Sequence, residues 1–417
     1  MSPTLRRVLI ITGFSLVALG LFFAIWYVFF RPDGAVIGNS NQSGSITNGL
    51  PGVQNSNVNR TRPGQNVNVL PLDNGSSSQP SSVANGGATF VSAVTSGPAN
   101  GATVNLATGD LQYYDKSTGL FYKVSADGAS KNPLTTDAYP DVQSVNWAPN
   151  GSQAILAFPD GSKVLYDFTN KKQSTLPSEL NNFSFSPQSD QIAAKYLDPQ
   201  NTDNQWLIIS KPDGTQSQTT EHLGSNADKV TVSWSPNNQI VAAYAKSVNA
   251  GQQEIIFLGT NNENFQSVNV NGRGYTPVWS PDGRKILYSV YSPLTDDNPH
   301  LFMMSGAPES LGSGMVDVGL DTSADKCSFA ASGTAIYCAV PYYYNSGSGA
   351  QPSLSAGIPD NIYKIDLRTG TVTLVARPVD DQKNQRFSAT NLQVAADESS
   401  LFFTDAITGT IQQVRLR

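Results

Sequence analysis

The stretch that decides the fold is Val278-Trp279-Ser280-Pro281-Asp282-Gly283-Arg284-Lys285-Ile286-Leu287-Tyr288. Pro281 presets φ for the first position of a turn, and Asp282 suits the second. Gly283 accepts the left-handed conformation that closes a three-residue hairpin with a bulge. A large apolar residue therefore ends one strand, a tight turn follows, and Ile286 begins the next strand.

The same unit returns along the chain, each time with a large apolar residue before the turn. Clear copies begin at Trp147, Phe185, Trp234 and Phe329, and a β-like run follows each. Two weaker copies align with each other without gaps and lead into a D-x-x-T-G turn, whose Asp caps the turn amides. The seven predicted blade anchors are Val104, Trp147, Phe185, Trp234, Trp279, Phe329 and Val394.

The spacing of these blade anchors predicts the architecture. Its mean is near 48 residues, and a four-stranded propeller blade takes about 40–50 residues. We therefore expect an all-β, seven-bladed β-propeller over residues 88–417, with six or eight blades as the alternatives. We predict that the side chains of the anchors pack between neighbouring sheets. The long gap after Phe329 predicts a loop inserted in the sixth blade.

The last repeat contains only three predicted strands, whereas residues 88–94 precede the first repeat and form a predicted strand with no pairing strand assigned. Pairing these two pieces would close the ring and remove two open sheet edges. We therefore predict that Ala88 to Val94 forms the outer strand of the seventh blade, against Thr410 to Arg417.

The N-terminal region differs from the repeats in composition. Residues 8–30 are 23 consecutive residues without a charge, enough to cross a ~30 Å hydrocarbon core as a helix. We predict an uncleaved transmembrane signal anchor, and residues 1–7, with Arg6 and Arg7, on the cytoplasmic side. A cleavable signal peptide is the alternative. Residues 31–87, rich in Gly, Ser, Asn and Gln, are predicted to be a disordered tether that holds the propeller outside the membrane.

The W-S-P-D-G-x-x-[IL] signature resembles the WD40-like PD40 repeats of the TolB family. The same repeats occur in the propeller domain of prolyl-oligopeptidase and dipeptidyl-peptidase-IV-type enzymes. The resemblance covers about residues 100–417 and implies a propeller that binds protein partners, as TolB does in the cell envelope. This chain departs from TolB in its predicted anchor and tether. It departs from the peptidases because it contains no G-x-S-x-G elbow.

Charge and composition exclude several function classes. Residues 88–417 hold 21 basic and 30 acidic residues, a balance that disfavours nucleic-acid binding. Two His and two Cys in 417 residues make a His/Cys metal cluster improbable. Acidic and amide clusters at residues 198–204, 296–298 and 380–381 offer oxygen ligands for Ca²⁺, but none matches a 12-residue calcium loop. We expect solvated loop tips, and neither a metal nor a cofactor.

Catalytic residues are not expected. His222 and His300 lie in polar stretches that read as surface loops, whereas a Ser-His-Asp site needs a positioned imidazole. The predicted innermost strands carry small, apolar or amide side chains, and these supply no general acid or base.

Two other features are candidates for binding and for a covalent link. Tyr342, Tyr343 and Tyr344 lie where a strand meets the predicted insertion, and a strand would expose either Tyr343 or the two residues around it. They form a possible partner surface. Cys327 and Cys338 face each other and can bond if their turn has two residues, but are offset by one if it is a three-residue bulged turn.

Together these observations predict a membrane-tethered, extracytoplasmic β-propeller that binds a protein or envelope component without catalysis. The alternative is a propeller enzyme, such as a lyase, lactonase or glycan hydrolase, acting in the central channel.

Overall fold

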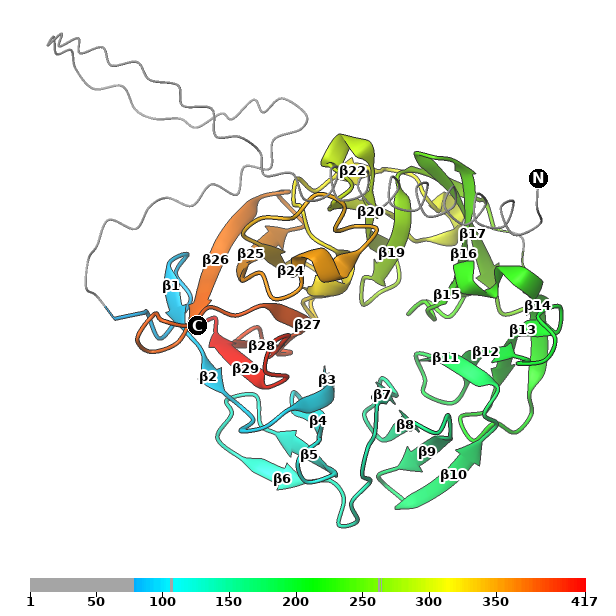
Figure 1. Ribbon diagram of the computed structural model, residues 1–417, viewed down its shortest axis with the longest axis horizontal. Helices are drawn as coiled ribbons and strands as arrows, with labels where there is room; N and C mark the ends of the chain where they lie inside the picture. The colour runs from blue at the N-terminus through cyan, green and yellow to red at the C-terminus, as the bar shows by residue number, and fades with distance from the viewer. Residues whose placement is uncertain (1–78, 106–107, 262, 264) are drawn as a thin grey trace, which may run out of the picture. The chain divides into compact units, whose positions relative to one another are not determined.

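The structure is a computed structural model that describes residues 79–417, except 106–107, 262 and 264. Seven antiparallel sheets of four strands each stand around a central axis, one of them with a fifth strand added. Most of the first strands of neighbouring blades contact one another around the centre (Figure 1). The all-β, seven-bladed prediction is therefore confirmed.

The first four blades follow the chain from the innermost strand outwards. They are β3 (Ala99–Val104), β4 (Leu111–Asp115), β5 (Leu120–Val124) and β6 (Lys131–Pro133); β7 (Ser144–Trp147), β8 (Gln153–Ala157), β9 (Lys163–Asp167) and β10 (Lys172–Leu176); β11 (Leu180–Phe185), β12 (Ile192–Leu197), β13 (Gln205–Ser210) and β14 (Gln218–His222); and, after η1 (Gly224–Lys229), β15 (Val230–Val232), β16 (Ile240–Asn249), β17 (Gln252–Gly259) and β18 (Val268–Asn271).

The last three blades include four short 3-10 helices. They are β19 (Arg273–Trp279), β20 (Lys285–Tyr291), η2 (Pro293–Thr295), β21 (Pro299–Ser305), η3 (Pro308–Ser310) and β22 (Val316–Asp317); η4 (Ala324–Lys326), β23 (Cys327–Phe329), β24 (Ala335–Pro341), η5 (Pro352–Ser355), β25 (Asp360–Asp366) and β26 (Val372–Val379); and β27 (Ala389–Val394), β28 (Ser400–Asp405) and β29 (Ile411–Arg415).

Six of the seven blade anchors are the last residue of an innermost strand, and Trp234 follows β15 by two residues. Trp147 illustrates their surroundings. Its indole lies 5.7 Å from the Phe121 ring and 4.9 Å from the Phe168 ring, and it donates a 2.6 Å hydrogen bond to the Gly101 carbonyl of the preceding blade. A large side chain at this position thus fills the space between two sheets.

The turn after each blade anchor differs in one respect from the prediction. The Ser280 N–H donates to the Lys285 carbonyl at 2.9 Å, so four residues, and not three, lie within the turn. The Lys285 N–H is satisfied by the Ser280 hydroxyl at 2.9 Å, which replaces a backbone bond. Gly283 has φ of +68°, the left-handed conformation expected for it.

Inner-strand amide side chains join neighbouring blades. Asn391 donates to the Ala102 carbonyl at 2.7 Å, and Asn146 donates to the Phe183 carbonyl at 2.8 Å. These amides point to the adjacent blade and satisfy carbonyls that no strand covers. Their role around the channel is therefore structural.

Ring closure follows the prediction only in part. The expected strand divides into β1 (Ala88–Phe90) and β2 (Ser92–Ala93). β2 pairs with β29 as the outer strand of the seventh blade, as predicted, but β1 pairs in parallel with β26 of the sixth blade. Val91, between the two, is buried in a core shared by both blades. One short segment thus ties the last two blades together.

The predicted membrane anchor, residues 8–30, and the tether, residues 31–87, lie outside the described residues except for 79–87. In that part, the Ala84 and Gly86 N–H groups donate to the carbonyls of Arg415 and Val375 at 2.8 and 2.7 Å, so this end of the predicted tether is attached to the ring. In the described part of the chain, no helix combines the length and the apolar character that a membrane span requires.

Candidate binding face at the mouth of the channel

The predicted insertion lies between β24 and β25, over residues 342–359, and contains η5. The β20–β21 loop of the fifth blade holds it in place. The Gly347 and Gly349 N–H groups donate to the carbonyls of Asp296 and Asp297, at 2.9 and 2.8 Å. The Ser348 N–H donates to the Asn298 side chain at 3.2 Å. We call the end of the ring that carries this segment the insertion face.

Two consecutive residues of the supporting loop are in the left-handed conformation. Asp296 has φ of +52° and Asp297 has φ of +54°. Such a conformation costs an L-residue roughly 1 kcal/mol, and Asp tolerates it better than most residues. The strain orients both carbonyls toward the insertion. Strained backbone of this kind is concentrated at binding and functional sites.

A cavity of about 410 Å³ lies beneath the insertion, among the fifth, sixth and seventh blades. Two tyrosines, Tyr291 and Tyr344, line it together with the charged residues Asp325 and Lys326 of η4. Most of the remaining lining consists of small or hydroxyl-bearing residues: Gly274, Thr276, Ser289, Ser323, Ser348, Gly349, Ser353, Ser355, Ala356, Gly357, Ser388, Thr390 and Ala406.

An ion pair stands beside this cavity. The Lys326 ammonium lies 2.7 and 2.9 Å from the two carboxylate oxygens of Asp360. The Asp360 side chain is fully buried, whereas that of Lys326 is 16% exposed. Burial raises the pKa of Asp360 although the ammonium opposes that shift. The same carboxylate accepts the Ala389 N–H at 2.7 Å, so the pair also joins the sixth blade to the seventh.

The three consecutive tyrosines alternate as a strand would. Tyr343 is 56% exposed, whereas Tyr342 is buried with the Arg386 guanidinium 5.0 Å from its ring. Tyr344 points into the cavity lining, and burial raises the pKa of its hydroxyl. Of the two arrangements left open by the sequence, the structure has the one that exposes Tyr343 alone.

Exposed apolar side chains cluster near the insertion. Tyr343, Leu354 and Ile407 each follow or precede a residue that lines the cavity, and Leu354 and Ile407 are 43% and 67% exposed. Leu294, in η2 of the neighbouring blade, is 79% exposed. We call Tyr343, Leu354 and Ile407 the apolar rim. Large exposed apolar groups gathered on one face are typical of a binding surface.

The two histidines are on strands, and not in loops as predicted. His222 ends β14, where its ring contacts Trp206 and its Nε2 lies 2.5 Å from the Asp203 carbonyl. His300 is the second residue of β21, the third strand of its blade. Its Nδ1 lies 2.6 Å from Asp321, and its Nε2 lies 2.7 Å from Asp317. Neither histidine belongs to an innermost strand.

His300 has a defined protonation state in this arrangement. A neutral imidazole has one N–H donor and one acceptor, whereas carboxylates only accept. Two short contacts to carboxylates therefore require the imidazolium. Burial lowers the pKa of His300, but the two carboxylates outweigh it and raise the pKa above 6.5.

The acidic clusters mostly organise loops. Asp198 accepts the Gln200 N–H at 2.9 Å and the Asn204 amide at 2.8 Å. Asp380 accepts the Asn384 N–H at 2.7 Å. Across the described residues, no three His, Cys, Asp or Glu side chains gather as metal ligands would.

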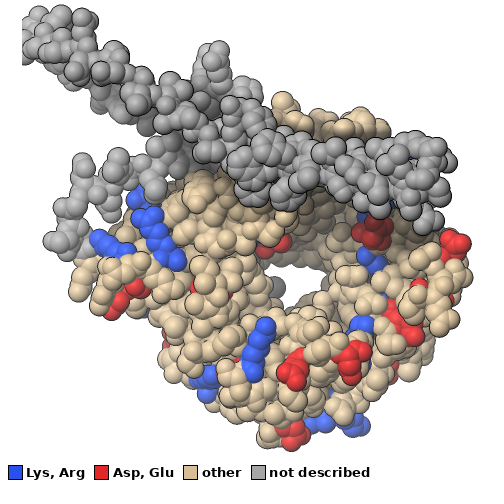
Figure 2. All heavy atoms as spheres, viewed as in Figure 1, with Lys and Arg blue, Asp and Glu red and all other residues tan. Residues whose placement is uncertain are grey.

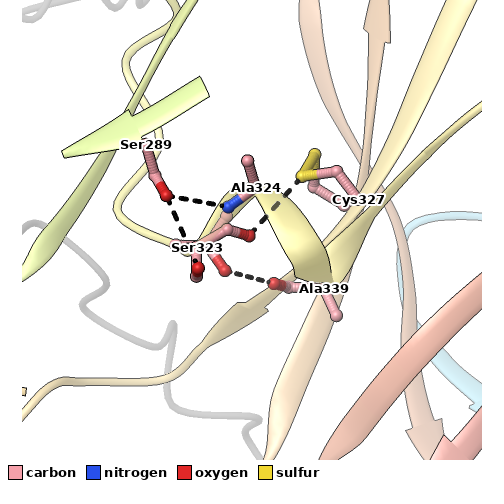
Figure 3. The surroundings of a disulfide bond; sticks show 7 residues. Ser289, Ser323, Ala324, Cys327 and Ala339 are labelled. Carbon is pink, nitrogen blue, oxygen red and sulfur yellow. Dashed lines mark hydrogen bonds between the residues drawn. A yellow bond between two sulfur atoms is a disulfide. The ribbon is translucent and has the colours of Figure 1, made fainter. Parts of the chain in front are cut away.

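The two cysteines form a disulfide within the sixth blade. Cys327 and Cys338 are directly opposite each other on β23 and β24. The Ala330 N–H donates to the Ala335 carbonyl, so this turn also contains four residues and keeps the register of the other copies. Figure 3 shows the bond beside Ser323 and Ala324, which precede it in the chain; the Ala324 N–H donates to the Ser289 hydroxyl of the fifth blade at 3.1 Å.

The centre of the ring is open in the space-filling view, and mostly uncharged side chains surround the opening (Figure 2). The inner-strand segments predicted at residues 143–146, 181–184, 231–233 and 275–278 lie on or beside β7, β11, β15 and β19. The sequence reasoning missed Asp325, Lys326 and Asp360. Asp325 and Lys326 are in a short 3-10 turn before an innermost strand, and only the fold brings Asp360 to them.

Comparisons with known proteins bear on the fold alone. No protein-family model matches the chain, and no curated protein matches it. A solved structure of an oligogalacturonate lyase in complex with manganese has a TM-score of 0.52 and 13% identity, covering 76% of this chain and 88% of that one. A β-propeller domain from Myceliophteria thermophila has a TM-score of 0.52 and 13% identity, covering 77% and 97%. Tricorn protease has a TM-score of 0.47 and 10% identity, covering 77% and 34%.

At such identities structural similarity reports the fold and not the activity. The match to the isolated domain spans almost all of that domain, in agreement with the closed ring of seven sheets. The described part of this chain is therefore a seven-bladed β-propeller that resembles the propeller of oligogalacturonate lyase.

Proposed function

We propose that this protein is a membrane-tethered, extracytoplasmic β-propeller that binds a protein partner or an envelope component without catalysis. The binding surface is the insertion face. One observation carries the proposal: the apolar rim and Leu294 expose four large apolar side chains on loops of three neighbouring blades. Solvent exposure of such a set is costly for a protein that does not bind anything there.

The membrane anchor at residues 8–30 and a tether over residues 31–78 remain part of the proposal on the strength of their sequence alone. The disulfide supports an oxidising compartment, where such bonds persist. The propeller would then face the periplasm or the extracellular space, and the tether would let the insertion face reach a partner near the membrane.

Affinity capture tests the proposal if matched variants are compared. Full-length protein is used to capture partners from membranes of the source cells. The rim variant combines Tyr343→Ser, Leu354→Ser and Ile407→Ser. The control combines Met315→Ser and Val316→Ser, two exposed apolar residues on the outer edge of the fifth blade. We expect partners that the wild type and the control retain and the rim variant loses. Equal capture by all three proteins would contradict the proposal.

The alternative, an enzyme acting in the central channel, would have to use the ionisable groups at the mouth of the channel. Lys326 is the basic residue that lines the cavity. If the enzyme alternative holds, Lys326→Met should abolish the turnover of a substrate that the wild type converts, whereas the non-catalytic proposal predicts no turnover by either protein.

A further inference from the structure

The cavity beneath the insertion has the size of a side-chain or small-ligand pocket. Its volume of about 410 Å³ lies within the ~300–1,000 Å³ typical of ligand sites. The apolar rim is immediately adjacent in the chain to residues that line it. We therefore expect a partner that contacts the rim to reach the loops that line the cavity.

The charge of the lining selects the kind of group that enters. Lys326 and Asp360 neutralise each other at 2.7 Å. Asp325, the neighbouring residue in η4, is exposed, and within the described residues no Lys, Arg or His lies within ion-pair distance of its carboxylate. The cavity therefore has one uncompensated negative charge. Burial is the largest cause of the raised pKa of Tyr344, and the carboxylates of Asp360, Asp325 and Asp321 raise it further.

We propose that this cavity receives a basic side chain, Arg or Lys, of the protein partner, with its charged head at Asp325 and its aliphatic stem between Tyr291, Tyr344 and the apolar rim. The inference rests on the proposed function and names the chemistry of the partner. Arg and Lys bury their methylene stems on apolar surface while the head keeps a polar contact. Tyrosine rings favour a nearby cation.

Other occupants fit the lining less well. An anionic group would meet the Asp325 carboxylate. Lys326, the basic residue of the lining, is already paired with Asp360, and Arg273, whose guanidinium lies 5.9 Å from the Tyr291 ring, is outside the lining. A purely apolar group would remove water from that carboxylate and supply no partner, which is costly for a charge. A cation with an apolar stem satisfies both the rim and the carboxylate.

The roof of the cavity is already in place in the structure. A Cβ atom on Gly349 would lie 2.3 Å from the Tyr291 Cβ and 2.7 Å from the Asp297 carbonyl oxygen, so only glycine allows this approach. The left-handed Asp296 and Asp297 hold the insertion against the fifth blade. A preformed site avoids the ordering cost of binding.

A fragment titration of the full-length protein tests the inference without any partner. n-Butylguanidinium is titrated by ligand-observed NMR, in parallel with n-butanol and pentanoate, which share its n-butyl stem. We expect saturable binding of the cation and markedly weaker binding of the other two. Asp325→Asn removes the charge at nearly constant shape and should weaken cation binding about fivefold, the upper range of an exposed ion pair. The control, Asp381→Asn, removes an exposed charge outside the lining and should change nothing.

A second variant tests the cavity itself, in case Asp325→Asn changes the affinity for the cation too little to measure. Ala356 is exposed and lines the cavity, so Ala356→Trp should obstruct the pocket and abolish cation binding. Binding of n-butanol equal to that of the cation, or cation binding that survives both variants, would overturn the inference. The titration uses no partner, so its failure would contradict only the assignment of the cavity. Failure of the capture experiment with the rim variant would contradict the proposed function.

Discussion

Gly283 and Gly333 occupy the same position in two copies of the repeated turn, with φ of +68° and +65°. Their surroundings differ. A Cβ on Gly283 would lie 2.7 Å from the Asn237 backbone nitrogen in the preceding blade, whereas a Cβ on Gly333 would meet nothing within 4 Å. Comparing Gly333 with Gly283 therefore separates two requirements for glycine: a positive φ, which both positions share, and lack of space for a Cβ atom, which applies only at Gly283.

Alanine substitutions at these two positions should have different effects. Gly333→Ala should cost about 1 kcal/mol of unfolding free energy, the penalty of the left-handed conformation. Gly283→Ala should cost more, roughly 2–4 kcal/mol, because the methyl group also displaces the neighbouring blade. Chemical denaturation of both variants measures the difference. Equal losses would show that the contact with Asn237 in the fourth blade relaxes without cost.

His300 should make stability depend on pH. Its folded-state pKa is raised above 6.5, so the imidazolium contribution is fully present below pH ~6.5 and is lost as pH rises through the folded-state pKa. Thermal melts between pH 6 and pH 9 should show wild-type stability falling relative to His300→Gln. The difference should be reduced in Asp317→Asn, which removes one of the two carboxylates. Parallel curves for wild type and His300→Gln would refute the assignment.

At the scale of elements, the hairpin of β23 and β24 carries the disulfide beside the cavity. The bond joins residues 11 positions apart, a loop for which the chain-entropy model gives about 2–3 kcal/mol of stabilisation. Cys327→Ser with Cys338→Ser should lower the Tm, and wild type in reductant should approach the double variant. A reductant effect on the double variant itself would indicate another cause.

The closure segment is the second element with a testable role. Deletion of residues 1–78 should leave the stability of the ring unchanged, whereas a chain that begins at residue 95 loses β1, β2 and Val91. The latter should melt at a clearly lower temperature, because two sheet edges open and a shared core loses a side chain. Val91→Ala supplies a milder control, with an expected loss of about 1–3 kcal/mol. Equal melting of both truncations would contradict the closure role.

At the scale of the whole molecule, limited proteolysis tests the proposed anchor and topology. External protease on intact cells or spheroplasts should release a fragment of about the size of the propeller, because we propose that residues 31–417 are outside. The tether is the expected cleavage site, since its composition offers little to fold. Full protection until lysis would contradict the proposed topology.

The repeat made the architecture predictable. Turn residues and large apolar residues act locally, so Gly283, Pro281 and the seven anchors could be identified without knowledge of distant contacts. The same local rules anticipated that the Asp of the D-x-x-T-G turn caps its amides, as Asp115 does where its carboxylate accepts the Ser117 N–H at 2.9 Å. The expected inner strands were also found in place.

The tertiary structure decided what depends on residues far apart in the chain. Lys326 meets Asp360 across 34 positions, and Ala88–Phe90 pairs with a strand nearly 300 residues away. No local pattern specifies these contacts, because an ion pair or an edge pairing depends on which surfaces the closed ring brings together. The sequence by itself thus determined the blades and the positions of their turns. Only the fold determined how the ends are joined, which tyrosine is exposed, and which side chains surround the cavity.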